Sequence, residues 1–161
     1  MPRLLIVYHS RTGGTRQMAE AACAAASDET ETILRRARDA TPEDLLAADG
    51  YLFAAPENLA ALSGEMKEFF DRCYYSALGQ IEGRPYGLMV CAGSDGESAV
   101  KQAARIATGW RLKQVQPPLI VCTHAQTPED ILAEKTIPEV DLARCRDLAA
   151  ALAAGIAMGV F

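Results

Sequence analysis

Short, nearly unbroken apolar runs recur along the chain with helical patterns between them. Four of these runs lie at residues 4–8, 51–55, 86–91 and 119–122. Such runs are typical of strands that are buried on both faces of a parallel sheet. A weaker fifth run, residues 32–37, carries Arg35 and Arg36. We interpret it as an edge strand, because an exposed strand face tolerates charge.

Helical periodicity fills the intervals between the runs. It is clearest after Ser63, where six apolar residues recur at three- and four-residue steps: Met66, Phe69, Phe70, Cys73, Tyr74 and Ala77. A first helix is indicated by Met18, Ala22 and Ala25, and a last one by Leu142, Cys145, Leu148, Leu152 and Ile156. This spacing gives each helix one apolar face that packs against the sheet.

Two further helices are indicated by their start signals. Thr41 and Pro42 provide an N-cap and a first-turn proline for a short second helix. Ser94 and Glu97 have the spacing of a capping box, so a fourth helix is predicted to follow Ser94. Its apolar stripe would be Val100, Ala103, Ile106 and Ala107.

Strands that alternate with helices predict an α/β fold, with a parallel sheet, right-handed crossovers and helices on both faces. No linker or internal repeat interrupts the alternation, and 161 residues suit a single domain spanning residues 1–161. In open sheets of this kind, ligands bind beyond the carboxyl ends of the strands. Those ends are residues 9–15, 56–63, 92–96 and 123–138.

Charge and composition narrow the function classes. The formal net charge is −5 and the sixteen basic residues are scattered, which argues against a nucleic-acid partner. An apolar run that begins by Leu4 is too early for a signal peptide, and no stretch reaches the length of a membrane span, so we expect a cytoplasmic protein with no membrane partner. The five cysteines lack CxxC spacing, which disfavours a disulfide framework or a zinc site.

The stretch YHSRTGGTRQMAEAA places two adjacent glycines between the first strand and the first helix. Gly13 and Gly14 remove side chains where backbone amides turn toward the helix N-terminus, and such a nest binds phosphate. Ser10, Thr12 and Thr15 would add hydroxyl donors. The structural alternative is that the glycines only permit a tight turn and that Thr15 caps the helix.

Other phosphate-handling classes with this topology fit poorly. A Walker loop needs a lysine after its glycine, whereas Thr15 follows Gly14 directly, and the GxGxxG fingerprint is absent. A receiver domain would need an acidic residue where Ala54 and Ala55 end the third strand. A small phosphatase would need a cysteine in the first loop.

Three segments in order resemble the flavodoxin-like family, which includes flavodoxins and NAD(P)H-dependent FMN and quinone reductases. SRTGGT resembles its phosphate loop, ADGYLFAAPENLAALSGEMKEFFDR resembles its third strand, flavin loop and following helix, and VCAGSDGES resembles its second flavin loop. The resemblance covers residues 4–109 and, more loosely, the rest. It implies a flavodoxin-like three-layer sandwich whose five-stranded parallel sheet has the strand order 2-1-3-4-5.

The resemblance also implies FMN as cofactor and a set of binding residues. Around the phosphate it places Ser10, Arg11, Thr12, Gly13, Gly14 and Thr15. On one side of the isoalloxazine it places Pro56, Glu57, Asn58, Leu59 and Ala60, and on the other Ala92, Gly93, Ser94 and Gly96. Structural alternatives remain for the second group: Pro56 ends a strand, Asn58 sits in a turn, and Ser94 caps a helix.

Within this family the sequence favours an oxidoreductase over an electron carrier. Carrier flavodoxins commonly sandwich the flavin between aromatic rings, but neither PENLAALS nor AGSDGES contains one, and the only tryptophan, Trp110, lies elsewhere. The first loop has no glycine before Gly64, although Asn58 tolerates positive φ. The mild net charge also differs from that of acidic carriers.

An uncovered flavin would accept a hydride from NAD(P)H and pass it to a quinone or similar small acceptor. A flavodoxin-type carrier and a non-catalytic flavin-binding redox sensor remain alternatives. No catalytic acid or base is assigned: His124 lies near the cleft, and Glu57 either contacts the flavin or faces water. Beyond Arg11, we identify no basic cluster in the cleft loops that would mark a site for the extra phosphate of NADPH, so the choice between NADH and NADPH stays open. The apolar stretch AALAAGIAMGVF either covers the sheet or forms a homodimer or higher homo-oligomer surface.

Overall fold

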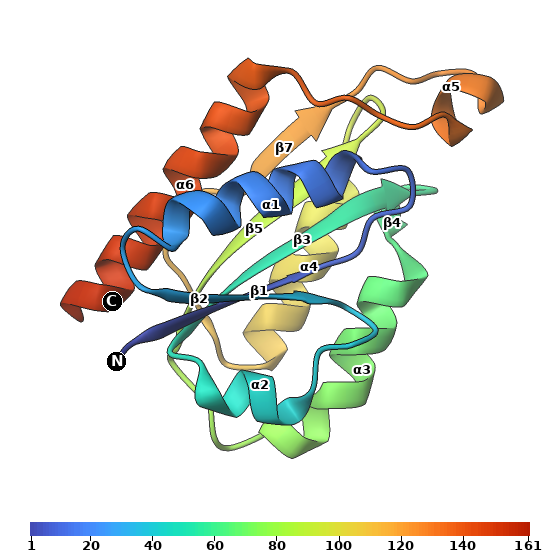
Figure 1. Ribbon diagram of the computed structural model, residues 1–161. Helices are drawn as coiled ribbons and strands as arrows, with labels where there is room; N and C mark the ends of the chain where they lie inside the picture. The colour runs from blue at the N-terminus through green and yellow to red at the C-terminus, as the bar shows by residue number, and fades with distance from the viewer.

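A central, mostly parallel sheet with helices on both faces forms the protein (Figure 1). The computed structural model describes residues 1–161. In chain order the elements are β1 (Arg3–Tyr8), α1 (Gly14–Ala26), β2 (Glu31–Arg36), α2 (Pro42–Ala47), β3 (Gly50–Asn58), β4 (Ala61–Leu62), α3 (Gly64–Ala77), β5 (Pro85–Ala92), α4 (Glu97–Gly109), β6 (Lys113–Gln114), β7 (Leu119–Cys122), α5 (Pro128–Leu132) and α6 (Glu139–Met158).

The strand order confirms the predicted flavodoxin-like α/β fold. The main parallel path is β2-β1-β3-β5, and both β6 and β7 pair with β5 in parallel. They are two pieces of one interrupted fifth strand, and Pro117 and Pro118 lie between them. Proline has no backbone N–H to donate, so the ladder breaks at this point. The additional strand β4 pairs antiparallel with the end of β3.

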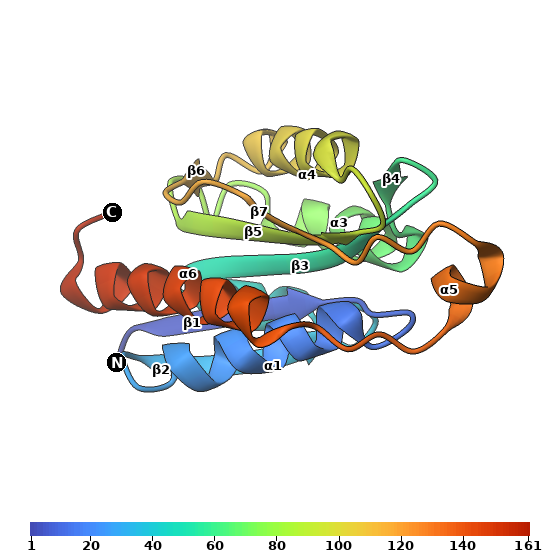
Figure 2. The ribbon, with the colours of Figure 1, turned by 90° about the horizontal axis from the view of Figure 1, so that it is seen from above.

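Two apolar layers enclose the sheet. Figure 2 shows α1 and α6 covering one face, with α3 and α4 on the other. On the α3 and α4 face, Phe53, Phe69 and Phe70 surround Trp110, whose ring lies 5.4 Å from that of Phe70. Trp110 is therefore a core residue and not part of the cleft. None of the helices combines the length and the apolar character needed to cross a membrane.

Two of the three predicted helix starts are confirmed and one is wrong. Thr41 forms the capping box with Asp44, and α3 begins directly after Ser63. Ser94 does not cap α4: the N-cap is Gly96, at φ 90°, and the helix begins at Glu97. The Gly96 N–H donates to the Glu57 carboxylate over 2.7 Å, which fixes the chain reversal two residues beyond the predicted start.

We predict that Thr41→Ala lowers the free energy of unfolding by about 1 kcal/mol, because it removes the acceptor for the Asp44 N–H at the start of α2. Thr41→Ser keeps the hydroxyl and should stay close to the parent. Urea unfolding measures both variants. An equal loss in the two would show that the methyl group of Thr41, and not its capping hydroxyl, is responsible.

Candidate functional site

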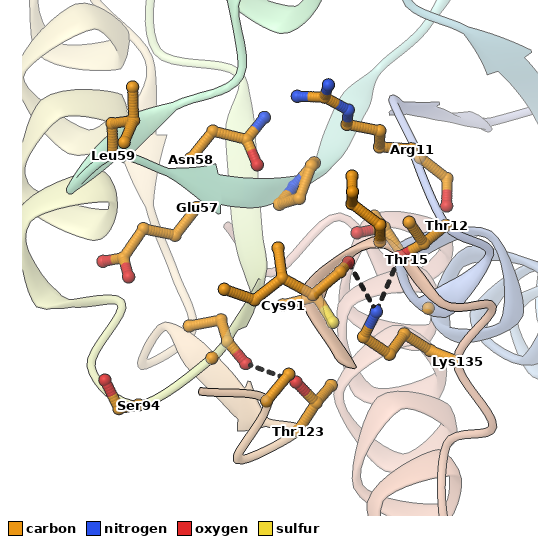
Figure 3. Close-up of a pocket in the computed structure, with 18 of the residues that line it drawn as sticks. Arg11, Thr12, Thr15, Glu57, Asn58, Leu59, Cys91, Ser94, Thr123 and Lys135 are labelled. Carbon is orange, nitrogen blue, oxygen red and sulfur yellow. Dashed lines mark hydrogen bonds between the residues drawn. The ribbon is translucent and has the colours of Figure 1, made fainter. Parts of the chain in front are cut away.

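A pocket of about 400 Å³ opens at the carboxyl ends of β1, β3, β5 and β7 (Figure 3). Its walls come from the β1–α1 loop, the β3–β4 turn, the segment after β5, and the long connection that contains α5. The lining residues are Ser10, Arg11, Thr12, Gly14, Thr15, Pro56, Glu57, Asn58, Leu59, Cys91, Ala92, Gly93, Ser94, Thr123, Ala125, Gln126, Ile131, Leu132 and Lys135. The four strand ends named from the sequence therefore meet around one cavity.

The structure brings most of the sequence-predicted site residues into this pocket. These are Ser10, Arg11, Thr12, Gly14, Thr15, Pro56, Glu57, Asn58, Leu59, Ala92, Gly93 and Ser94. Three others lie outside its lining. Gly13 borders a neighbouring pocket, Ala60 is exposed at the tip of the β3–β4 turn, and Gly96 is the N-cap of α4.

The β1–α1 loop presents several unused hydrogen-bond donors to the pocket. Gly13 has φ +91°, a conformation that favours glycine, and its N–H donates to the Ser10 hydroxyl. The backbone amides of Arg11, Thr12, Gly14 and Thr15 donate to no protein atom. Thr15 is only 2% exposed, and its buried hydroxyl group also has no hydrogen-bond partner. A buried polar group of this kind is normally satisfied by a ligand or an ion.

Gly14 is required by packing and not by its backbone angle. A Cβ atom at this position would lie 3.0 Å from the Cys91 sulfur, 3.4 Å from Ile137 Cδ1 and 3.5 Å from the Lys135 Cβ. The two adjacent glycines thus have different roles: Gly13 makes the turn, and Gly14 lets two segments, the end of β5 and residues 135–137, approach the loop.

Residues 127–138, which contain α5, form a strap across the side of the pocket where the β1–α1 loop lies. The Lys135 N–H donates to the Thr12 carbonyl, and Gln17 on α1 bonds both Lys135 O and Ile137 N. The Lys135 ammonium group donates to Thr12 Oγ1 over 3.3 Å and to the carbonyls of Ile131 and Ala133 (Figure 3). The strap therefore places one positive charge, the Lys135 ammonium group, next to the β1–α1 loop.

Sequence reasoning missed the contribution of this strap. The pocket residues that it did not name are Cys91, Thr123, Ala125, Gln126, Ile131, Leu132 and Lys135. Lys135 is the second basic residue of the pocket lining, beside Arg11. The available signal was that Lys135 is the only lysine or arginine in residues 123–138, a segment already placed at a strand end.

The β3–β4 turn on the opposite wall is strained. Leu59 and Ala60 have φ values of 51° and 62°, and they connect paired residues Asn58 and Ala61 as a two-residue hairpin turn. Positive φ at both central residues normally calls for asparagine or glycine. The positive-φ role that the sequence suggested for Asn58 was wrong, because Asn58 remains in β3. Leu59 is fully exposed at this tip.

Glu57 connects the two walls of the ring side. Its carboxylate accepts the Gly96 N–H at 2.7 Å and so holds the β3 end against the start of α4. Glu57 therefore does not simply face water. On the adjacent wall, the amides of Thr123 and His124 donate to the carbonyls of Ala92 and Gly93. His124 itself is exposed and lies outside the pocket lining.

The floor of the pocket carries a thiol of low reactivity. Burial raises the pKa of Cys91 to about 11, so the group is a protonated thiol at neutral pH. All five cysteines are free. No aromatic side chain lines the cavity, and the exposed apolar side chains of Leu59, Ile131 and Leu132 stand at its rim. The site offers donors for an anion at one end and an uncovered apolar opening at the other.

The family profile described as NADPH-dependent FMN reductase matches residues 20–127. The chain belongs to this family. Members of the FMN reductase family and flavodoxins bind FMN, and the unpartnered amides and the buried Thr15 hydroxyl fit the phosphate of that cofactor.

Two relatives represent the two functions that the sequence suggested, one each. A flavodoxin from Aquifex aeolicus is 40% identical over 86 residues, which is 52% of this chain and 46% of that protein. An NAD(P)H dehydrogenase (quinone) from Acidithiobacillus ferrooxidans is 33% identical over 94 residues, covering 45% of this chain and 47% of that protein. The chain spans about half the length of these two relatives.

Solved structures support the fold of this FMN reductase family member. A flavodoxin from the domain Archaea matches 96% of this chain and 98% of its own with a TM-score of 0.77 and 18% identity. A WrbA-like flavodoxin from Agrobacterium tumefaciens matches 99% of both chains with a TM-score of 0.74 and 21% identity. The resemblance inferred from the three sequence segments is confirmed.

We predict that Ala60→Gly raises the free energy of unfolding by up to ~1 kcal/mol, because glycine relieves the cost of positive φ at the turn. Ala61→Gly is the matched control: it lies in β4 next to the turn, where glycine should instead cost about 0.5–1 kcal/mol. Urea unfolding compares the two. A similar loss in both variants would contradict backbone strain at Ala60.

Proposed function

We propose that this chain is an FMN-dependent oxidoreductase that takes a hydride from NAD(P)H and passes it to a quinone or a similar small acceptor. The observation that carries the proposal is a pocket with anion donors at one end and no aromatic cover at the other. We take residues 1–161 as one FMN-binding domain. Its cytoplasmic location and its assembly as a monomer or homo-oligomer stay predictions.

In this proposal the FMN phosphate lies on residues 10–15. The free amides of Gly14 and Thr15 stand at the N-terminus of α1, where the helix dipole also favours a negative charge. The Thr15 hydroxyl donates to the same group. Lys135 provides a counter-charge from the strap, and Gln17 holds the strap in place.

The isoalloxazine ring then lies between the β3–β4 turn and residues 92–94. The hydrogen bond between Glu57 and the Gly96 N–H keeps the two walls at a fixed spacing. Leu59, Ile131 and Leu132 leave an apolar opening on which a nicotinamide or quinone ring can stack. When bound, the flavin supplies the hydride chemistry, and the chain supplies binding, orientation and access.

No side chain of the pocket is assigned as a catalytic acid or base. Cys91 is buried and protonated at neutral pH, and His124 lies outside the lining. The nicotinamide and the quinone would occupy the same open face in turn, which leads us to expect ping-pong kinetics. The proton that the quinone gains together with the hydride would come from solvent.

A flavodoxin-type electron carrier is the second candidate. The 40% identity to the Aquifex aeolicus flavodoxin favours it, although that match covers 46% of the relative. A non-catalytic redox sensor would use the same FMN site. The uncovered ring side and the mild net charge of −5 favour turnover over both alternatives.

We predict that Thr15→Val weakens FMN binding by about 10- to 100-fold and leaves riboflavin binding unchanged, because a hydrogen bond to the charged phosphate is lost. Lys135→Met should act in the same direction. Thr136→Val, an exposed neighbour on the strap, is the control. Fluorescence-quenching titrations with FMN and riboflavin measure each affinity. An equal loss of affinity for FMN and riboflavin would contradict the assignment of the phosphate to residues 10–15.

We predict that NADH or NADPH bleaches the flavin of the FMN-loaded protein directly, and that a quinone restores its colour over repeated cycles. Anaerobic stopped-flow absorbance follows both half-reactions. The same protein without added nucleotide is the control for photoreduction. No bleaching with either nucleotide, together with build-up of a one-electron-reduced flavin under photoreduction, would favour the carrier instead.

A further inference from the structure

A second pocket of about 230 Å³ lies on the other side of the phosphate loop. It is lined by Tyr8, His9, Ser10, Arg11, Gly13, Arg16, Arg36, Arg38 and Glu65. Ser10 and Arg11 border both pockets, so the two cavities meet at the same two residues. The second pocket stands at the carboxyl ends of β1 and β2, which pair in register up to Tyr8 and Arg36.

Four arginines from three segments converge here with little compensation. Arg11, Arg36 and Arg38 take part in none of the ion pairs of the chain. Arg16 approaches Glu20 and Glu134 only at 3.9 and 3.8 Å.

The one acidic residue of the pocket is already engaged. Glu65 Oε2 lies 3.3 Å from His9 Nε2, while His9 Nδ1 shares a 2.8 Å hydrogen bond with Ser63. Burial lowers the pKa of His9, against the opposing effect of Glu65, so the imidazole is largely neutral at neutral pH. Glu65 is the only carboxylate that lines the pocket beside the four arginines, and an anionic ligand would complete it.

Guanidinium groups in such a cluster match the geometry of a phosphate. Arginine forms charge-assisted, often bidentate, hydrogen bonds with phosphate oxygens. The FMN phosphate is served by other donors, because Gly14 and Thr15 line the first pocket and not the second. Both pyridine nucleotides carry a bridging pyrophosphate, but only NADPH carries a phosphate monoester, the 2′-phosphate of its adenosine. A monoester can hold two negative charges and exposes three oxygens to a cluster of guanidinium groups.

We propose that the pocket formed by Arg11, Arg16, Arg36 and Arg38 binds the 2′-phosphate of NADPH and makes this chain prefer NADPH over NADH. The proposal rests on the proposed oxidoreductase function, which it deepens by naming the cosubstrate. Arg11, which borders both cavities, would lie along the path of the nucleotide from the flavin to the 2′-phosphate. Arg36 and Arg38 belong to this pocket alone.

The test compares 2′,5′-ADP with 5′-AMP as ligands of the FMN-loaded protein, by isothermal titration calorimetry. The parent should bind 2′,5′-ADP about tenfold more tightly or better, as expected for hydrogen bonds to a charged group. The double substitution Arg36→Ala, Arg38→Ala should remove that preference and leave FMN affinity unchanged. Arg105→Ala, an exposed and unpaired arginine on α4, is the matched control and should keep it. Thermal unfolding of each variant verifies that it is folded.

Equal affinity of the parent for both ligands would overturn the proposal, and so would a preference that survives the double substitution. Binding of inorganic phosphate with no preference for 2′,5′-ADP would also overturn it, because the pocket would then be a general anion site. These outcomes are distinct from failure of the oxidoreductase itself. If neither nucleotide reduces the flavin, the proposed function fails, while the comparison of 2′,5′-ADP with 5′-AMP still decides what the arginine pocket binds.

Discussion

Close approach of three segments at Gly14 determines the shape of the candidate site. The end of β5 reaches the loop through the Cys91 sulfur, and the strap reaches it through Ile137 and Lys135. Interiors are packed at crystal-like density, so a side chain at Gly14 would push the strap or β5 away. The packing at Gly14 therefore sets how closely the strap, with Lys135, lies against the β1–α1 loop.

The opposite wall is organised in a different way. The Leu59–Ala60 tip has an unfavourable backbone conformation, and it is held by the β3–β4 pairing and by the bond from Gly96 to Glu57. Strain of about 1–3 kcal/mol per residue persists only where the surroundings enforce it, and it is concentrated at functional sites. The pocket therefore has one wall shaped by close packing at Gly14 and one wall shaped by a strained turn that its pairing holds in place.

Sequence patterns determined the fold and most of the pocket lining, for identifiable reasons. The apolar runs and the glycine pair are local signals, and they correctly located the strands and the loop between β1 and α1. The prediction of Ser94 as the cap of α4 was wrong because the capping-box spacing is also a local signal. The observed start at Glu97 depends on the bond from the Gly96 N–H to the Glu57 carboxylate, 39 residues away. Lys135 was missed because only tertiary packing of the strap brings it to Thr12.

Basic residues lie on both sides of the β1–α1 loop, and they differ in what they can bind. In the proposed binding mode, neutral amides and a hydroxyl meet most of the hydrogen-bonding demand of the phosphate, and Lys135 and Arg11 are the cations that line the same pocket. Arg16, Arg36 and Arg38 line only the second pocket, so they remain available to another anion. They also create a positive region on a chain that is acidic overall, and such a region steers anionic ligands toward the adjoining cleft at low ionic strength. A protein that reduces its flavin with a diffusing, highly charged nucleotide benefits from this arrangement, whereas a carrier that docks on a basic partner through an acidic face does not.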